Sequence, residues 1–225
     1  MTIQEKFERL GIDNAPGQEA LQAAQALELR CCKLDGAPVD FSHGDVDAHV
    51  PTPGSFEVFA AGVEEGGAQA YTPYRGRKEI LAHVAASLSA FTGAAIDPAQ
   101  NVILTPGTQG ALFLAMGANI MPGDKVAIVE PDYFANRKMV EFFGGEMVPI
   151  PMRYEAVRSG AGTDLDALER AFQAGATLFL FSNPNNPVGC VYSYDEITAI
   201  AAMAKRYGAT LLVDELYSRQ VYPGV

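Results

Sequence analysis

Thr177-Leu-Phe-Leu-Phe-Ser182 is apolar at every inner position. A strand with one solvent-facing side alternates apolar and polar residues, whereas a strand without polar positions is typical of a parallel sheet that is buried on both faces. Val126-Ala-Ile-Val129 has the same character. These two stretches therefore predict a parallel sheet covered by helices on both sides.

Outward from these strands, strand-like and helical patterns alternate between residues 77 and 214. Apolar residues at three- and four-residue spacing mark the helices, and Gly, Pro or polar caps mark their ends. Ser193 and Glu196 have the spacing of a capping box. The order indicates an α/β fold, a three-layer α/β/α domain with a mainly parallel sheet. We predict strands at 101–105, 125–130, 147–151, 177–182 and 210–214, and helices at 77–91, 109–121, 134–143, 165–174 and 195–207.

The N-terminal third is less regular. Residues 19–34 have a loose apolar side that predicts a helix, and residues 39–42 predict a short strand. The rest of 35–75 is rich in Gly and Pro without sustained periodicity, which predicts mostly loop.

Composition excludes several classes of function. The 225 residues include 16 Lys and Arg against 27 Asp and Glu, a net charge of −11, which disfavours nucleic acid or anionic membranes as partners. No apolar run reaches the roughly 18 residues that span a bilayer. The charged residues among the first nine disfavour a signal peptide, and three Cys do not form a disulfide framework. We therefore expect a cytoplasmic protein.

Residues that follow the predicted strands carry the chemistry, because ligands of open α/β sheets bind beyond the strands' carboxyl ends. The helix start at Gly107 offers backbone N–H groups to a phosphate. Asp214 ends a buried strand and should face a cation. With Tyr133 and the turn 183–189, these residues suit a planar, phosphorylated, nitrogen-containing ring. Taken singly, each also has a structural explanation: a strand–helix turn, a salt bridge, a core aromatic or a surface turn.

Five motifs follow one another along the chain: Tyr71-Thr-Pro-Tyr-Arg-Gly76, Thr105-Pro-Gly-Thr-Gln-Gly-Ala-Leu112, Pro131-Asp-Tyr133, Asn183-Pro-Asn-Asn-Pro-Val-Gly189 and Asp214-Glu-Leu-Tyr217. They stand in the order and approximate spacing of the fold-type I, pyridoxal-phosphate-dependent aminotransferases of classes I and II. The chain resembles this aspartate aminotransferase superfamily over about residues 39–217. The resemblance implies a PLP transferase-like fold, with residues 1–45 as an N-terminal arm and part of a small domain, and residues 46–225 as an incomplete cofactor-binding large domain.

The resemblance also implies roles around pyridoxal phosphate. Asp214 would pair with the pyridine nitrogen and keep it protonated, which makes the ring an electron sink. Tyr133 would stack on the ring, and Asn186 and Tyr217 would hydrogen-bond its phenolic oxygen. The cofactor phosphate would be cradled by Gly107, Thr108 and Gln109.

Further implied contacts involve a second subunit and the substrate. Tyr71 would reach the phosphate of the neighbouring subunit, so the resemblance implies a homodimer with shared active sites. Gly44 matches a loop over the substrate, and His43 is a candidate substrate contact. The Asn186–Pro187 peptide is a candidate cis bond. Val188 stands where the family usually has Thr.

The implied reaction moves an amino group from an amino acid to a 2-oxo acid by a ping-pong imine mechanism. In the family, the lysine that forms the imine follows the Asp-x-x-Tyr motif by some tens of residues, in a Ser-x-x-Lys-like context. None of the lysines here fits: Lys6, Lys33, Lys78, Lys125, Lys138 and Lys205. We expect that lysine and the substrate-binding arginine beyond residue 225, in an enzyme of which this is the N-terminal half, and we expect the 225 residues alone not to transaminate.

Three alternatives remain open. The same cofactor shell serves lyases, decarboxylases and cyclising synthases. The absent lysine would also suit a non-catalytic binding module. His43-Gly-Asp-Val-Asp-Ala-His49 has the residue types of a zinc or manganese site, but we favour a solvated loop there and predict no metal.

Overall fold

The computed structural model describes residues 2–11, 50–65, 71–155 and 162–222. The chain divides into two compact units, Met1–Asn14 together with Thr105–Val225, and Ala15–Leu104. The predicted helix at 19–34, the predicted strand at 39–42 and the predicted domain boundary after residue 45 lie outside the described residues. The domain division therefore stays a prediction.

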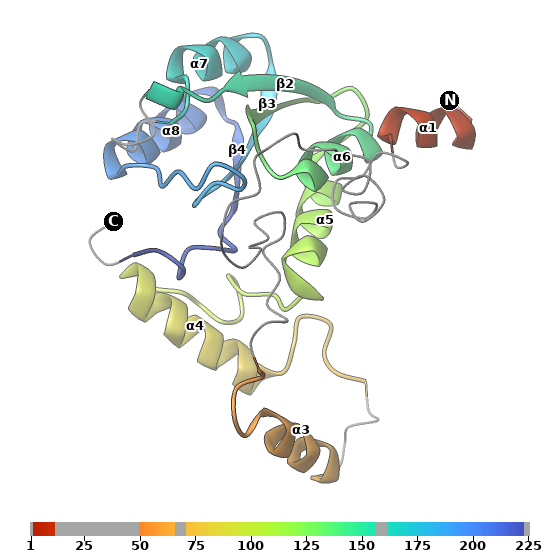
Figure 1. Ribbon diagram of the computed structural model, residues 1–225, viewed down its shortest axis with the longest axis vertical. Coiled ribbons are helices and arrows are strands. Elements are labelled where there is room, and N and C mark those ends of the chain that lie inside the picture. Colours follow the sequence, from red (N-terminus) through yellow and green to blue (C-terminus); the bar gives the residue numbers. More distant parts are fainter. Residues whose placement is uncertain (1, 12–49, 66–70, 156–161, 223–225) are drawn as a thin grey trace, which may run out of the picture. The chain divides into compact units, whose positions relative to one another are not determined.

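The first unit contains a four-stranded sheet with the order β2-β1-β3-β4, and each neighbouring pair is parallel (Figure 1). Four of the predicted strands are confirmed to within one residue at each end. The strands are β1 (Lys125–Glu130), β2 (Glu146–Pro151), β3 (Ala176–Ser182) and β4 (Thr210–Asp214).

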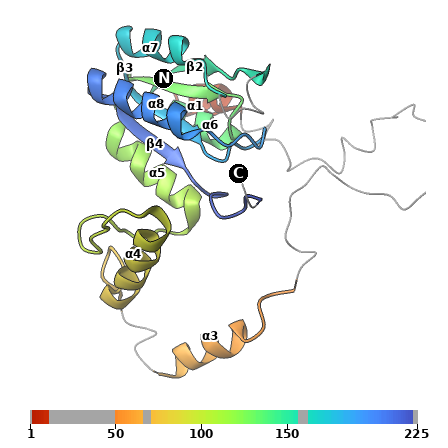
Figure 2. The same cartoon turned by 90° about the vertical axis from the view of Figure 1, so that its left-hand side faces the viewer.

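Helices cover both faces of this sheet, as the apolar strands predict. Figure 2 shows β4 between α5 and α8. Alternate residues of β3 face opposite layers: Leu178 and Leu180 pack in the cluster that includes α5 and α6, and Phe179 and Phe181 pack in the cluster that includes α7 and α8. The three-layer α/β/α prediction is confirmed. The helices are α5 (Gly107–Asn119), α6 (Phe134–Phe142), α7 (Leu165–Gln173) and α8 (Tyr194–Tyr207), each within two residues of its prediction.

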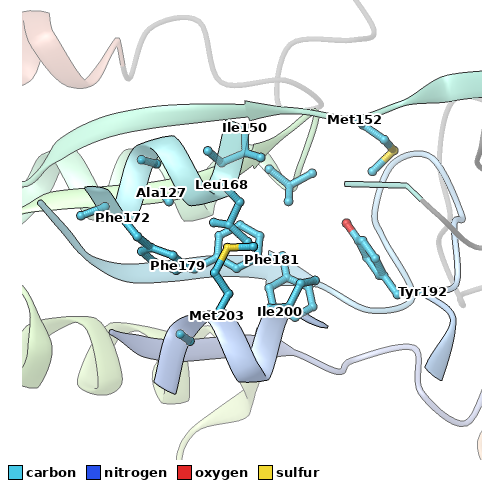
Figure 3. Packing of buried hydrophobic residues seen from close by; sticks show 14 of the residues in the cluster. Ala127, Ile150, Met152, Leu168, Phe172, Phe179, Phe181, Tyr192, Ile200 and Met203 are labelled. Atoms are coloured by element: carbon cyan, nitrogen blue, oxygen red, sulfur yellow. The ribbon is translucent and has the colours of Figure 1, made fainter. Parts of the chain in front are cut away.

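The larger core cluster lies between the sheet and the pair α7 and α8 (Figure 3). The Phe179 and Phe181 rings are stacked with centroids 4.9 Å apart, and Phe181 meets Tyr192 edge-on at 5.3 Å. Leu168 and Ile200 close the cluster from the helices and are completely buried. The aromatic side chains of β3 therefore form the centre of this layer.

A short N-terminal helix, α1 (Ile3–Leu10), contacts α6 within the same unit. A capping box between Thr2 and Glu5 begins it. The Lys138 ammonium of α6 donates a 2.7 Å hydrogen bond to the carbonyl of Gly11, just past the end of α1. Lys6 places its ammonium 3.7 Å from the centroid of the Phe142 ring. Side chains of both helices thus fix α1 to α6.

The second unit contains α3 (Ser55–Glu64) and α4 (Lys78–Thr92). The predicted helix at 77–91 is confirmed as α4 to within one residue at each end, and Gly93 ends it with φ +73°. The prediction of mostly loop over 35–75 is wrong for α3. The spacing of apolar residues did not predict α3, because no residue of this helix is buried. Its apolar side chains therefore do not form the single stripe of a helix that packs on a core.

The predicted strand at 101–105 is also wrong. Residues 102–105 have no regular secondary structure. Two of their backbone groups form hydrogen bonds with Arg75 instead of with a neighbouring strand. The Leu104 N–H donates to the Arg75 carbonyl at 2.9 Å, and the Arg75 guanidinium donates to the Val102 carbonyl at 3.0 Å. Ile103 and Leu104 are exposed within this unit. An apolar run alone therefore did not establish a sheet strand.

In the described part of the chain, no helix has both the length and the apolar character needed to cross a membrane.

Candidate functional site

The carboxyl ends of β1, β3 and β4 meet at one edge of the sheet, because the strands are parallel and Ser182 of β3 pairs in register with Asp214 of β4. A cavity of about 320 Å³ opens at this edge, within the first unit. It is the position at which ligands bind in open α/β sheets. The lining residues are Gly107, Thr108, Gln109, Leu112, Tyr133, Ser182, Asn186, Asp214, Leu216 and Tyr217.

Seven of the residues singled out from the sequence line this one cavity: Gly107, Thr108, Gln109, Tyr133, Asn186, Asp214 and Tyr217. Their roles stay predictions. Tyr71 belongs to the other unit, where its side chain is fully exposed. His43 and Gly44 lie outside the described residues.

The start of α5 contributes uncapped backbone to the cavity. Gly107 adopts φ +73°, a conformation that favours glycine, and no atom lies within 4 Å of where a Cβ would stand. The N-cap residue Pro106 provides no side-chain hydrogen bond, and the first turn has no acidic residue. The partial positive charge of a helix start attracts anions. This wall of the cavity therefore suits a phosphate.

Gln109 is held in place by a contact with α6. Its side-chain amide lies 3.4 Å from the sulfur of Met139. Met139 belongs to the buried cluster that α5 and α6 form against the sheet. The first turn of α5 is thereby tied to the helix that Tyr133 begins.

Asp214 contributes a buried negative charge at the end of β4. The residue is 8% exposed, and its Oδ1 accepts a 3.1 Å hydrogen bond from the Leu216 N–H. None of the ion pairs among the described residues includes Asp214. A buried carboxylate without a cation is unfavourable. Asp214 is therefore suited to a cationic N–H group on a ligand in the cavity.

The turn after β3 brings Asn186 to the cavity wall. The Asn186–Pro187 peptide is cis, as predicted. The Asn186 N–H donates to the Ser182 hydroxyl at 3.2 Å. The buried Asn185 braces the turn from inside: its N–H donates to the Cys190 carbonyl at 2.8 Å, and its Oδ1 accepts from the Val188 N–H at 3.1 Å. The backbone at Asn186 is thus held by the protein itself.

Two aromatic residues complete the wall. Tyr133 is the N-cap residue of α6, and its ring lies 4.8 Å from that of Phe134. Tyr217 lies in the turn after β4, where its carbonyl accepts from the Gln220 N–H at 2.8 Å. Aromatic faces offer a stacking surface to a planar ligand, and the phenol hydroxyls offer hydrogen bonds.

Sequence reasoning missed the polar residues behind the cavity wall, above all Asp132. This carboxylate accepts hydrogen bonds from residues of β3 and of the following turn, as far as 53 positions away in the chain. The available signal was a charged residue directly after a fully apolar strand, but the motif Pro131-Asp-Tyr133 was interpreted for its aromatic ring alone. Its partners are distant in sequence, so no local spacing indicated them.

Among the described residues, no group of three or more His, Cys, Asp or Glu side chains could hold a metal ion. The stretch 43–49, considered above as a metal site, falls outside them.

Comparison with known proteins identifies the family. The family model described as "Aminotransferase class I and II" matches residues 41–224. An aspartate aminotransferase of Sulfolobus acidocaldarius is 33% identical over 160 residues, which are 71% of this chain and 40% of that protein. Human kynurenine–oxoglutarate transaminase 1 is 32% identical over 68% of this chain and 38% of its own length.

Solved structures agree. An aspartate aminotransferase from Rhodobacter sphaeroides is 58% identical to this chain, with a TM-score of 0.84 over 99% of this chain and 54% of that one. N-succinyldiaminopimelate aminotransferase from Mycobacterium tuberculosis is 28% identical with a TM-score of 0.70. The chain spans about half the length of the relatives it matches. With the family model over most of its residues, the resemblance inferred from the five motifs is confirmed: the chain belongs to the class I and II aminotransferases.

Proposed function

We propose that the protein binds pyridoxal phosphate in this cavity and transfers an amino group from an amino acid to a 2-oxo acid. The observation that carries the proposal is that one side of the cavity suits an anion and another side suits a cation. An uncapped helix start, which suits an anion, and a buried carboxylate, which suits a cation, line the same cavity of about 320 Å³. Pyridoxal phosphate carries both complementary groups, a phosphate and a ring nitrogen that can be protonated.

The residues of the chain divide the work of binding. The backbone at Gly107, Thr108 and Gln109 would hold the phosphate. Asp214 would accept a hydrogen bond from the protonated ring nitrogen and stabilise its positive charge. When bound, the cofactor supplies a ring that withdraws electrons from the substrate's α-carbon.

Three further side chains would orient the ring. Tyr133 would stack on it. The Asn186 amide and the Tyr217 hydroxyl would donate to its phenolic oxygen. The turn that carries Asn186 is hydrogen-bonded within itself, so the backbone from which this donor extends is held before any ligand arrives.

The proposal extends to groups beyond the cavity. No lysine of the described residues lines it, and the cofactor-bonding lysine is proposed to lie outside those residues. Tyr71 would reach the phosphate of a second subunit, in a homodimer with shared active sites. Gly44 and His43 would contact the substrate. The cytoplasm is the proposed compartment.

The relatives suggest the first substrates to test. Two of them are aspartate aminotransferases, and one is 58% identical over nearly the whole chain. We therefore propose L-aspartate as amino donor and 2-oxoglutarate as acceptor. The test is turnover, with added pyridoxal phosphate, by the purified enzyme that includes the cofactor-bonding lysine, followed by product identification. No binding of the cofactor would contradict the proposal.

The acceptor requirement separates transamination from lyase, decarboxylase or synthase chemistry on the same fold. Transamination consumes one 2-oxo acid for each amino acid converted, so omitting 2-oxoglutarate should stop the reaction after one amino acid has been converted per active site. Sustained product formation without an acceptor would reject transamination and favour a lyase or decarboxylase.

A further inference from the structure

Asp132 joins two walls of the cavity without being a residue of its lining. It stands between the end of β1 and Tyr133, at the start of α6. Its Oδ2 accepts from the N–H and the hydroxyl of Ser182, each at 2.9 Å, and from the Asn185 amide at 3.2 Å. One carboxylate therefore ties the β1–α6 connection to the turn that follows β3.

The other carboxylate oxygen faces α6. Oδ1 accepts from the Tyr133 N–H at 2.7 Å and from the Asn136 side-chain amide at 2.8 Å. Asn136 is completely buried, and its own amide oxygen has no hydrogen-bond partner in the described part of the chain. A buried amide with an unpaired oxygen is unfavourable. The bond to Asp132 is the polar interaction that this buried amide makes.

Ser182 extends the connection to the ring-binding side. Its hydroxyl donates to Asp132 and accepts from the Asn186 N–H at 3.2 Å. A hydrogen-bonded path thus runs from Tyr133 through Asp132 and Ser182 to Asn186. Both ends of the path line the cavity, and both are residues proposed to contact the ring rather than the phosphate.

We propose that Asp132 is a positioning residue that fixes Tyr133 and Asn186 in the arrangement that a pyridoxal ring requires. The inference rests on the proposed function and deepens it. Every hydrogen-bond partner that the carboxylate has among the described residues is a donor, and a carboxylate accepts through both oxygens. Asp132 makes no hydrogen bond to α5, where the phosphate would bind, among the bonds of the described residues.

Asp132→Asn is the direct test because it keeps the shape and removes one acceptor. An amide has one oxygen and one NH₂ group, so at least two of the present donors would face an NH₂ group. The β1–α6 connection and the turn that follows β3 should then no longer be held at a fixed distance from each other. Pyridoxamine phosphate is the suitable probe, because its binding needs no covalent bond to a lysine. Inorganic phosphate, as a competitor, reports the α5 end alone.

In the purified protein, calorimetric titration should show that Asp132→Asn weakens pyridoxamine phosphate binding by about tenfold or more, since buried donors lose their partner. The inhibition constant of inorganic phosphate should change by less than about twofold, because the start of α5 is untouched. A purely structural role would weaken both together. Asp124→Asn, a turn carboxylate that accepts from the Met121 N–H, is the matched control and should change neither.

Each outcome decides a separate question. If the unaltered protein does not bind pyridoxamine phosphate, the proposed function fails and the inference fails with it. If the unaltered protein binds the probe and Asp132→Asn binds it equally well, or loses phosphate affinity to the same extent, the inference alone is overturned. If Asp132→Asn does not fold, Ser182→Ala decides: it breaks the path to Asn186, and unchanged affinity for pyridoxamine phosphate would reject the inference.

Discussion

The Thr163 N–H donates a 2.7 Å hydrogen bond to the carboxylate of Glu196, a residue of the first turn of α8 that is 5% exposed. The Gly162 N–H donates to the other carboxylate oxygen at 3.2 Å. Burial raises the pKa of the Glu196 carboxyl, and these N–H groups lower it in part. Glu196 thus links the chain before α7 to the start of α8. Folding makes its carboxyl group harder to ionise.

Glu196→Gln should therefore change the pH dependence of stability. A folded-state pKa above the unfolded one means that the favourable contribution of this group is complete below the unfolded pKa and declines as pH rises through the folded pKa. Gln does not titrate, so the unfolding free energy of the variant relative to the unaltered protein should increase as pH rises above the unfolded Glu pKa of about 4.3, by at most about 1.4 kcal/mol per pH unit. Urea unfolding across this range measures it.

The control for that experiment is Asp195→Asn. Asp195 neighbours Glu196 but is exposed, so its substitution should leave the shape of the stability curve unchanged. A difference between Glu196→Gln and the unaltered protein that stays constant or shrinks as pH rises would contradict a raised pKa for Glu196.

The layers of the fold could be predicted because the strands have no polar face. Leu178 and Phe179 point into opposite layers, and both are buried, which is what the uninterrupted apolar run indicated. The same criterion, an uninterrupted apolar run, gave a wrong strand at 101–105, where apolar residues are exposed. Ile103 is apolar but exposed in its unit, and its segment pairs with Arg75 rather than with a strand.

Residues of the cavity could be predicted for a similar reason, since each follows a strand or opens a helix and parallel strands bring their ends together. The resemblance then suggested a role for each of them. What could not be predicted is the hydrogen bonding behind the wall. Asp132 and Ser182 are 50 positions apart, and their contact depends on the exact neighbour order of β1 and β3.

Phe179→Ala should destabilise the first unit strongly. The side chain is completely buried and stacks on Phe181 in the centre of the layer between the sheet and α7 and α8. Truncation leaves a cavity, with an expected loss of about 3–5 kcal/mol in the free energy of unfolding. Tyr194→Ala removes an aromatic ring from an 85% exposed position and should change stability by less than about 0.5 kcal/mol. Equal losses in urea unfolding would contradict the assigned core.

Lys138→Met should loosen α1. The helix has eight residues, too few for stability without tertiary contacts, and the Lys138 ammonium is bonded to the carbonyl at its C-terminal cap. We expect hydrogen exchange of the α1 amides to accelerate about fivefold or more, from the loss of a charge-assisted hydrogen bond, with β1 and β3 unchanged. Lys205→Met, at an exposed position of α8, is the control. Unchanged exchange in α1 would mean that its other contacts suffice.

Asp214→Asn and Asp214→Ala should both remove the function proposed for the cavity while the fold persists. Asn keeps the side-chain volume and an oxygen for the Leu216 N–H, so it isolates the negative charge, whereas Ala removes the acceptor as well. Without that charge a protonated ring nitrogen loses its partner. In the enzyme that includes the cofactor-bonding lysine, turnover with pyridoxal phosphate should fall by about a hundredfold or more, the scale of removing a charged partner from a buried site. Asp195→Ala, on the exposed start of α8, should retain full turnover. Unaltered far-ultraviolet circular dichroism would confirm the fold, and turnover at the unaltered rate in either Asp214 variant would exclude this residue from the cofactor site.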